Sequence, residues 1–302
     1  MSTGVFADHQ DVDLPQGPLR VYQAGPAGAP CVVLLHGAML DTAELTWRHL
    51  MPALARDRRV VAVDMPRHGG SRPWEGLLDQ ARMERVVEEL LDHLGVSRAV
   101  LVGLSMGGGV GIGYALARPE RVAGLVAINP GGLDDKRPLQ LLTWLSLQCS
   151  PLLRWSMRWA ASPSVLRRSM LRTFARGEGT RDLGVLMELI GAEARRRVEH
   201  GERALDDWQI AAYGPRRMRL NHIPELPRLR VPSLWVHGRE DALVGRAVMR
   251  RAVAAAPGAV LAEIGGAGHL APLDQPDEVA AAITSFLDGL DRAAGGCDRD
   301  HG

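Results

Sequence analysis

The sequence has few cysteines and almost no net charge. Its three cysteines among 302 residues, Cys31, Cys149 and Cys297, are odd in number, and their spacings match neither a disulfide framework nor a zinc-binding pattern. Cys31 opens an expected core strand and Cys149 lies in an apolar helical stretch, so we expect both thiols to be buried. The formal net charge of +1 gives no reason to expect a nucleic-acid partner.

Long apolar runs are absent too, which predicts that no segment spans a membrane. Residues 1–14 are polar and acidic, and they lack the positive start and the apolar core of a signal peptide. The composition, 46% apolar and 24% charged, is that of an ordinary globular protein. We therefore expect a soluble, cytoplasmic protein, and the sequence leaves its oligomeric state open.

Short runs rich in β-branched residues alternate with helical patterns along most of the chain. This alternation predicts an α/β fold, with a doubly wound, mostly parallel sheet covered by helices on both faces. Residues 15–18 form a turn-like stretch between two early strands that we expect to pair as an antiparallel edge hairpin. The expected strands are Leu19–Gln23, Cys31–Leu35, Val60–Asp64, Ala99–Leu104, Val122–Ile128, Ser233–His237 and Val260–Ile264. The expected helices are Ala43–Ala55, Gln80–Leu94, Met106–Ala117, Gly245–Ala256 and Pro276–Leu290.

The alternation stops between residues 131 and 229, where only helical patterns occur. We interpret this segment as an all-helical cap inserted after the sixth strand, with residues 1–130 and 230–292 forming the core domain. Residues 293–302 are polar and glycine-rich, so we expect them to form a disordered tail. The expected cap helices are Gln140–Gln148, Leu152–Ala160, Val165–Ala175 and Leu183–Glu199.

A candidate nucleophile lies at the joint between an expected strand and an expected helix. Ser105 is flanked by Gly103-Leu104 and Met106-Gly107, a pattern typical of a strained turn that exposes a serine hydroxyl. Gly103 and Gly107 fit this interpretation because a Cβ at either position would crowd the turn. The same pattern also arises by chance in glycine-rich chains, so a serine with a purely structural role is the alternative.

A serine nucleophile needs a base, and that base needs an orienting carboxylate. In an open α/β sheet these groups lie on loops at the carboxyl ends of the strands. Polar residues follow the expected strands at four such places: His36-Gly37-Ala38-Met39, Asp64-Met65-Pro66-Arg67-His68-Gly69-Gly70-Ser71, Gly238-Arg239-Glu240-Asp241 and Gly265-Gly266-Ala267-Gly268-His269-Leu270.

These segments, taken with the serine turn, resemble the α/β-hydrolase superfamily, whose order along the chain is nucleophile, acid and histidine. The resemblance covers nearly the whole chain except the helical insertion, which corresponds to the variable cap of that family. It implies an eight-stranded, mostly parallel sheet with a helical cap. It also implies Ser105 as nucleophile, His269 as general base and acid, and Asp241 as the orienting carboxylate.

The resemblance further implies an oxyanion hole formed by the backbone N–H groups of Ala38 and Met106. The Met106 N–H opens a helix, where a developing negative charge is favoured. His36 resembles a structural histidine that holds the oxyanion loop by hydrogen bonding, next to Gly37. Arg67 and His68 lie in a turn that is structural in this family, and His237 is expected in the core.

Several alternatives stay open. Glu240 competes with Asp241 for the acid, Asp134, Asp135 and Asp274 are weaker candidates, and His269 itself has a surface-loop alternative. None of the ten histidines pairs with carboxylates at metal-ligand spacing, so we expect neither a metal nor a cofactor.

Departures from the family pattern narrow the chemistry. In the resembled family, the haloalkane dehalogenase and epoxide hydrolase branches carry an aspartate at the position of Ser105. The dehalogenases also use a side-chain halide donor at the position of Ala38, which an alanine cannot supply. The loop at His36 also lacks the HGGG run of one lipase group. We therefore expect a serine hydrolase that cleaves a small or medium carboxylic ester through an acyl-enzyme intermediate. The alternatives are perhydrolases, C–C bond hydrolases of dienoates, lactonases and thioesterases, or a ligand-binding receptor on the same fold.

The insertion is the main sequence clue to the substrate. Residues 134–230 hold 18 Lys and Arg against 11 Asp and Glu, which suits either an anionic substrate or solvated helix faces such as residues 195–197. Trp144, Trp155 and Trp159 suit either an apolar acyl pocket or core packing between cap helices.

Overall fold

The computed structural model describes residues 4–297 and contains an eight-stranded sheet in the order β1-β2-β4-β3-β5-β6-β7-β8. β1 and β2 form the antiparallel edge hairpin, β2 pairs antiparallel with β4, and every other pair is parallel. The predicted α/β class and doubly wound sheet are therefore confirmed. The strands are β1 (Gln10–Leu14), β2 (Gly17–Ala24), β3 (Cys31–Leu35), β4 (Arg59–Val63), β5 (Ala99–Leu104), β6 (Val122–Ile128), β7 (Ser233–Gly238) and β8 (Val260–Ile264).

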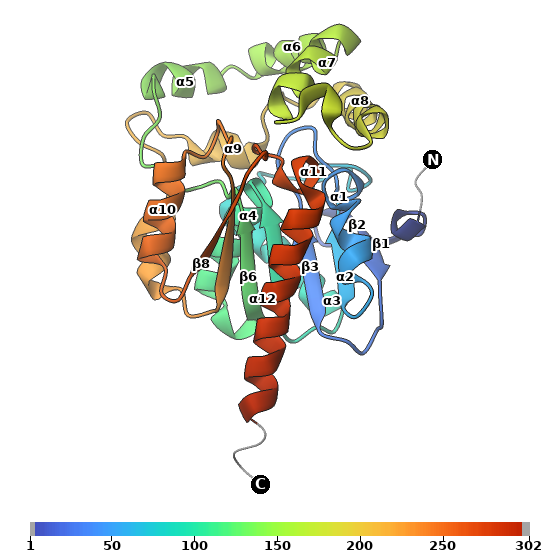
Figure 1. Cartoon of the computed structure of the whole chain (residues 1–302). Coiled ribbons are helices and arrows are strands. Elements are labelled where there is room, and N and C mark those ends of the chain that lie inside the picture. Colours follow the sequence, from blue (N-terminus) through green and yellow to red (C-terminus); the bar gives the residue numbers. More distant parts are fainter. Residues whose placement is uncertain (1–3, 298–302) are drawn as a thin grey trace.

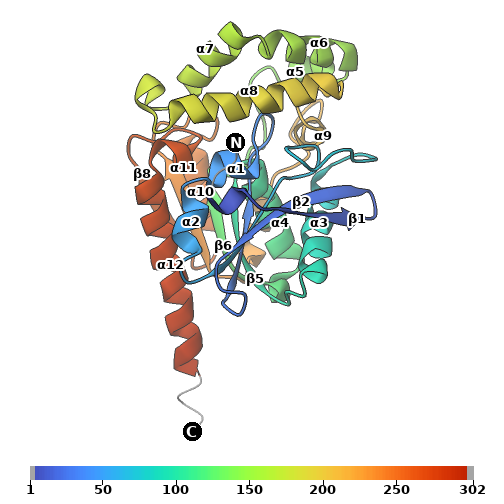
Figure 2. The same cartoon turned by 90° about the vertical axis from the view of Figure 1, so that its right-hand side faces the viewer.

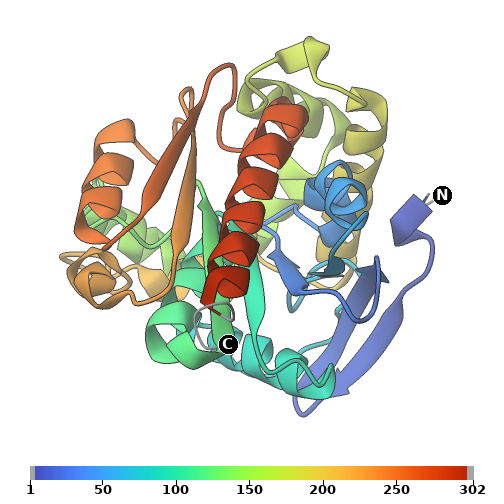
Figure 3. The same cartoon turned by 60° about the horizontal axis from the view of Figure 1, so that its bottom comes forward.

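Both faces of the central strands are buried, because helices cover the sheet on each side. Successive residues of a strand point to opposite faces, so Val33 and Leu35 pack in one apolar cluster while Val32 and Leu34 pack in the other. The first cluster lies under α3 (Gln80–His93), α4 (Met106–Ala117) and α10 (Arg246–Ala255). The second lies under α1 (Ala43–Trp47), α2 (Leu50–Leu54) and α12 (Pro276–Cys297), and Figure 3 shows α12 running along the sheet beside them.

Two glycines allow α4 to approach the sheet closely. A Cβ at Gly107 would lie 2.1 Å from the carbonyl oxygen of Leu35, and one at Gly103 would lie 2.3 Å from the backbone of Gly107. The Gly107 N–H also donates to the carbonyl of His36 at 3.1 Å. The first turn of α4 is therefore fastened to the loop that follows β3.

The segment between β6 and β7 is helical and covers one end of the sheet (Figures 1 and 2). It has an apolar cluster of its own, which includes Met157, Leu186 and Ile190 and is completed by Leu45 and Leu273 of the core. No helix among the described residues is long and apolar enough to cross a membrane. The helices of this cap are α5 (Gln140–Leu147), α6 (Ser150–Ala160), α7 (Pro163–Thr173), α8 (Leu183–Glu199) and α9 (Asp207–Ala212). A 3-10 turn at Gly177–Gly179 lies between α7 and α8, and another at Ile223–Arg228 lies between α9 and β7.

Three local expectations differ from the structure. The helix expected over Ala43–Ala55 is two short helices, α1 and α2, because the ring of Pro52 clashes with the carbonyl four residues earlier in a continuous helix. Helices α9 and α11 (Ala271–Asp274) have no counterpart among the expected helices. Helix α12 runs to Cys297 and so enters the segment for which we expected a disordered tail; residues 298–302 of that segment lie outside the described residues.

The two described free thiols differ in exposure. Cys31 is buried as expected, and burial raises the pKa of its thiol to about 11. Cys149 is exposed, so the expectation of a buried thiol is wrong there. The reason is local, because Cys149 caps the start of α6 at the junction with α5 instead of lying inside a packed helix.

We predict that Gly107→Ala lowers the free energy of unfolding by about 3 kcal/mol, because a Cβ there meets rigid backbone. Urea denaturation measures the change. The control is Gly184→Ala in α8, where the added Cβ meets no atom within 4 Å and where alanine is favoured over glycine by up to about 1 kcal/mol. Equal stability of the two variants would contradict the close approach of α4.

Candidate active site

Ser105 occupies a strained turn between β5 and α4. Its φ of 51° and ψ of −110° lie outside the regions that non-glycine residues usually adopt. The conformation is held on both sides of the residue. The Ser105 N–H donates to the carbonyl of Ile128 at 2.9 Å, and the Ser105 carbonyl accepts from Gly109 at 2.9 Å and from Gly131 at 2.8 Å. Such strain persists only where the surroundings impose it, which is typical of functional sites.

Two backbone donors lie on segments that contact Ser105. The N–H groups of Ala38 and Met106 have no hydrogen-bond partner among the described residues. The loop that holds Ala38 is close to the serine, since a Cβ on Gly37 would be 3.6 Å from the Ser105 Cβ. The neighbouring N–H groups are engaged: Gly37 with Asp41 at 2.7 Å, Met39 with Asp206 at 2.6 Å and Gly107 with the His36 carbonyl at 3.1 Å.

His269 and Asp241 are in direct contact. The Nδ1 atom of His269 lies 2.9 Å from Oδ2 of Asp241, while Oδ1 of Asp241 accepts the N–H groups of Leu243 and Val244 at 2.7 and 3.1 Å. Asp241 is therefore oriented by the backbone, and it favours the imidazole tautomer with hydrogen on Nδ1 and a lone pair on Nε2. Within the described part of the chain, no hydrogen bond joins the Ser105 hydroxyl to His269. Such bonds often tighten only when a ligand is bound.

The competing carboxylates have other partners. Glu240 accepts the N–H groups of Gly266 and Ala267 at 3.2 and 3.0 Å, and Asp274 accepts those of Gly268 and Ala175 at 2.9 and 3.0 Å. Burial raises the pKa of the Asp274 carboxyl. Both carboxylates thus stabilise the loop that carries His269 without contacting its ring. Asp134 forms an ion pair with Arg137 at 2.6 Å, and Asp135 is exposed.

Asn129, which the sequence analysis did not single out, connects the loops after β7 and β8. Its side-chain amide donates to the carbonyls of Gly268 and His269 at 3.0 and 2.9 Å, and its Oδ1 accepts the N–H of Gly238 at 3.1 Å. The residue is fully buried and has a φ of 40°. An asparagine directly after a buried strand was the only signal in the sequence, since asparagine tolerates the left-handed region and bonds nearby backbone.

His36 joins the loop after β3 to the turn after β4. Its Nε2 accepts the N–H of Met65 at 2.9 Å, and its Nδ1 is 2.7 Å from the carbonyl of Gly37. The ring is completely buried, and burial lowers the pKa of His36 to about 3. A neutral imidazole with hydrogen on Nδ1 satisfies both contacts. The other core candidate, His237, is also buried, with Nε2 at 2.9 Å from the Val244 carbonyl.

A family model described as the alpha/beta hydrolase fold matches residues 30–276. The chain belongs to the α/β-hydrolase fold family. Among its relatives is the pimeloyl-[acyl-carrier protein] methyl ester esterase of Edwardsiella ictaluri, 29% identical over 276 residues that cover 87% of this chain and 95% of the relative. Carboxylesterase YbfK of Bacillus subtilis is 26% identical over 284 residues, 90% of this chain and 85% of the relative. Its crystal structure superposes with a TM-score of 0.71 at 25% identity, covering 93% and 92% of the two chains.

A third relative is longer than this chain. It is the dihydrolipoyllysine-residue acetyltransferase component of an acetoin cleaving system from Pseudomonas putida, 29% identical over 271 residues. The match covers 89% of this chain but 66% of that protein. The shared part therefore corresponds to one region of a larger protein.

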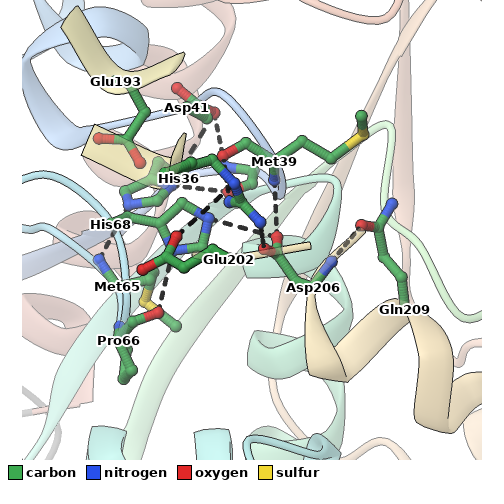
Figure 4. A network of polar contacts seen from close by, with 12 residues as sticks. His36, Met39, Asp41, Met65, Pro66, His68, Glu193, Glu202, Asp206 and Gln209 are labelled. Atoms are coloured by element: carbon green, nitrogen blue, oxygen red, sulfur yellow. Dashed lines mark hydrogen bonds and ion pairs between the residues drawn. The ribbon is translucent and has the colours of Figure 1, made fainter. Parts of the chain in front are cut away.

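In this α/β hydrolase the cap forms hydrogen bonds with the loop after β3 (Figure 4). Asp206 accepts the N–H of Met39 at 2.6 Å, and Arg197 of α8 donates to the Met39 carbonyl at 2.7 Å and to Asp206 at 2.6 Å. Met39 has a φ of 69°, an uncommon value for a residue with a side chain. The residue next to the free Ala38 N–H is thus held from both sides by the cap.

The arginine run at residues 195–197 is only partly a solvated face. Arg195 and Arg196 are exposed, but Arg197 is 2% exposed and directed into the contact with Met39. Helical periodicity explains the difference, since Arg197 lies on the same face as Glu193 and Ala194, which are also buried. The sequence signal was present in this periodicity, but Met39, the partner of Arg197 in the core, lies 158 residues away along the chain.

The turn after β4 is the second anchor of the cap. Arg72 bonds Glu193 of α8 and also Glu202, the latter at 2.8 Å from its Nε. Arg67 donates to Asp207 at the start of α9 at 2.7 Å. The turn that we expected to be structural therefore fastens the cap through ion pairs, and the buried pair of Arg72 with Glu193 is tolerated because both charges are paired.

Trp208 of α9 provides an apolar contact at the same junction. A Cβ added at Gly109 or Gly131 would lie 2.9 or 2.7 Å from its indole ring, so the ring packs closely against glycines of α4 and of the loop after β6. The indole N–H donates to Gln80 of α3. Unlike Trp208, Trp155 and Trp159 of α6 are exposed to solvent. They therefore fit neither the core packing nor the closed acyl pocket considered from the sequence.

A cavity of about 550 Å³ lies beside the ion pairs, lined by Arg67, Arg72, Trp74, Arg203 and Asp207 among others. A cavity of about 670 Å³ lies between α7 and α8. Neither lining includes Ser105 or His269. No cluster of three or more His, Cys, Asp or Glu side chains that could hold a metal ion occurs among the described residues.

His36 and His68 are neighbours with opposite pKa shifts. Their ring centroids are 4.9 Å apart, and both rings are buried. Burial alone would lower the pKa of His68, but Asp206, with Oδ2 at 3.3 Å from its Nε2, outweighs burial and raises that pKa. The pKa of Asp206 is well below its ordinary value, because the charges of Arg197 and His68 outweigh the effect of burial.

We predict that at a pH of about 6 His68 is an imidazolium and His36 is neutral. His68 then stabilises the folded state below pH 6.5, and this contribution is lost as the pH rises through its raised pKa. The pH dependence from His36 has the opposite sign, because burial lowers its pKa. The folded state holds the neutral ring without loss above pH 6.5 and becomes less stable as the pH falls from 6.5 toward 3. Long-range proton–nitrogen NMR spectra distinguish the two forms, with His68→Gln as the assignment control. A His36 ring that titrates near 6.5 would refute the assignment.

Proposed function

We propose that this α/β hydrolase cleaves small or medium carboxylic esters through an acyl-enzyme intermediate on Ser105. In this proposal His269 is the general base and acid, Asp241 orients it, and the N–H groups of Ala38 and Met106 form the oxyanion hole. The observation that carries the proposal is the direct contact between His269 and the buried Asp241, at the same end of the sheet as the strained Ser105 turn.

In the first half-reaction the Ser105 oxygen attacks the ester carbonyl, and Nε2 of His269 accepts the hydroxyl proton. The negative oxygen that forms is stabilised by the two free N–H donors, one of which opens helix α4. Asp241 stabilises the imidazolium through its contact with Nδ1. The carbon–oxygen bond to the alcohol then breaks, and the alcohol leaves with the proton returned by His269.

In the second half-reaction water replaces the alcohol. His269 accepts a proton from the water, whose oxygen attacks the acyl carbon, and the carbon–oxygen bond to Ser105 breaks. Ser105 regains its proton from His269, and a carboxylic acid is released. These steps require only groups supplied by this chain and by water.

Relatives support an ester substrate, and a 2-hydroxy-6-oxononadienedioate/2-hydroxy-6-oxononatrienedioate hydrolase of Cupriavidus pinatubonensis, 28% identical over 86% of this chain and 88% of its own length, supports the C–C alternative. Two of those reported above, with matches covering 85% or more of their length, are a methyl ester esterase and a carboxylesterase by name. The serine turn itself is common to ester, lactone, thioester and C–C bond hydrolysis. The substrate class is therefore the part of the proposal that depends on similarity.

We predict that a fluorophosphonate probe labels the native protein on Ser105, and that Ser105→Ala lowers p-nitrophenyl ester hydrolysis by roughly 10⁴-fold or more. A chain-length series of these esters, beside one lactone and one dienoate, defines the substrate class. Ser146→Ala, which removes an exposed cap hydroxyl, is the matched control and should retain full activity. Saturable ester binding with negligible turnover by the native protein would favour a receptor instead, and preferred cleavage of the dienoate would favour C–C hydrolysis.

We further predict that Asp206→Asn lowers kcat for ester hydrolysis by about 10- to 100-fold with little change in KM, because it loosens the residue beside the Ala38 donor. Asp207→Asn is the matched control. Asp207 is equally buried at the same junction, but it contacts Arg67 and Leu78 and not the loop after β3.

A positioning role of Asp206 predicts a kinetic effect that a purely structural role does not. The rate of fluorophosphonate labelling should fall in parallel with kcat in Asp206→Asn and stay near the native rate in Asp207→Asn, while thermal unfolding reports the stability of both. If both variants lose activity in proportion to stability, Asp206 is merely structural.

A further inference from the structure

The outer helices of the cap present apolar side chains to solvent. Helices α5 and α6 lie in the outermost layer of the molecule, at the end opposite the C-terminus in both Figures 1 and 2. Trp155 is 63% exposed, Trp159 60% and Leu142 63%. Large apolar side chains that are exposed on neighbouring helices, as on α5 and α6, mark an interaction surface. We name as the outer cap face the side chains of Leu141, Leu142, Leu145, Leu152, Trp155 and Trp159.

Helix α6 is apolar on two opposite sides. Leu153 and Met157 are buried, and Met157 belongs to the apolar cluster of the cap. Leu152, Trp155 and Trp159 follow one another at spacings of three and four residues, so they share a second side of the helix, which faces solvent. The inner side explains how the helix folds onto the cap, whereas the outer side has no partner among the described residues.

The chain segment that carries this face has charge of one sign. Residues 136–177 contain eight Lys and Arg and no Asp or Glu. Arg154 and Arg158 are exposed on α6 between its two apolar sides, and neither forms an ion pair with a described residue. An amphipathic helix with Trp and Leu on one side and unpaired arginines beside them is typical of helices that lie in a lipid–water interface.

The same charge argues against a second copy of this chain as the occupant. A two-fold contact places a patch against itself, so it would bring the arginines of one copy against those of the other. An anionic surface pairs with them instead. Indole rings suit the headgroup region, where their apolar body and N–H group are both accommodated, and arginine suits phosphate.

We propose that the outer cap face docks on the surface of an anionic lipid bilayer. The tryptophans and leucines enter the boundary between headgroups and acyl chains, and the arginines bind lipid phosphates. The core domain and the strained Ser105 turn then face the bilayer through the cap. This docking does not depend on the proposed hydrolysis, and it adds a lipid partner that the ester proposal does not require.

The test uses full-length protein carrying Ser105→Ala, so that no lipid is hydrolysed and the result is independent of activity. Flotation with vesicles of phosphatidylglycerol and phosphatidylcholine in equal parts is compared with flotation with pure phosphatidylcholine. We expect binding to the anionic vesicles, a blue shift of tryptophan fluorescence, and about tenfold or greater weakening on neutral vesicles or at high salt.

Two pairs of substitutions locate the surface. Trp155→Ser with Trp159→Ser should weaken binding about tenfold or more and remove the fluorescence shift, and Arg154→Glu with Arg158→Glu should abolish the preference for anionic vesicles. The matched controls are Leu77→Ser, an exposed apolar side chain of the core, and Arg85→Glu with Arg251→Glu, exposed arginines on α3 and α10. Circular dichroism checks that each variant is folded.

Three outcomes would overturn the proposal. Vesicle binding that is unchanged in the tryptophan pair, or that is weakened equally by the controls, would place the lipid contact elsewhere. Equal binding to neutral vesicles would remove the role of the arginines. Dimerisation in sedimentation velocity that the tryptophan pair abolishes, without vesicle binding, would assign the face to a second copy of the chain.

Discussion

The carboxylate of Asp206 is buried where the cap meets the core. It accepts hydrogen bonds from the Met39 N–H and the Arg197 guanidinium, and it forms an ion pair with His68. Burying a carboxylate costs several kcal/mol unless its oxygens are paired. Here the pairing comes from three segments: the loop after β3, the turn after β4 and helix α8. The cap, the oxyanion loop and the histidine turn can therefore reach their lowest free energy only together.

This constraint connects the parts of the candidate site. On one side, Met39 is held next to the unpaired Ala38 N–H. On the other, Gly107 fastens the start of α4 to the carbonyl of His36, so the Ser105 turn and the oxyanion loop share one hydrogen-bonded framework. In the same way, hydrogen bonds of the Asn129 side chain connect the loops that carry Asp241 and His269. The proposed reactive groups are few, and most of the buried polar side chains around them hold the loops of the candidate site in place.

Local patterns were sufficient for the fold. Cys31–Leu35, Ala99–Leu104 and Val122–Ile128 were predicted with the bounds that the structure has, because each is a short run buried on both faces and bounded by turn residues. The bounds of Val260–Ile264, a partly exposed edge strand, were also predicted correctly, from its flanking turn residues. The predicted pairing of Asp241 in preference to Glu240 with His269 agrees with the geometry, since adjacent residues of a loop face different ways. The roles of these residues in catalysis stay predictions. Pro52 divided an expected helix, and Cys149 proved to be exposed, because in each case one residue at a junction outweighed a regional pattern.

The sequence by itself determined the α/β architecture, the cap insertion as a helical segment and the strand ends at which the candidate catalytic residues stand. Those features follow from periodicity and turn residues, which act over a few positions. Only the tertiary structure decided that Arg197 points inward to Met39, that Asn129 joins two distant loops and that Trp155 and Trp159 face solvent. These depend on which segments pack together across the whole chain, and helical or strand periodicity carries no information about the partner that a given face will meet.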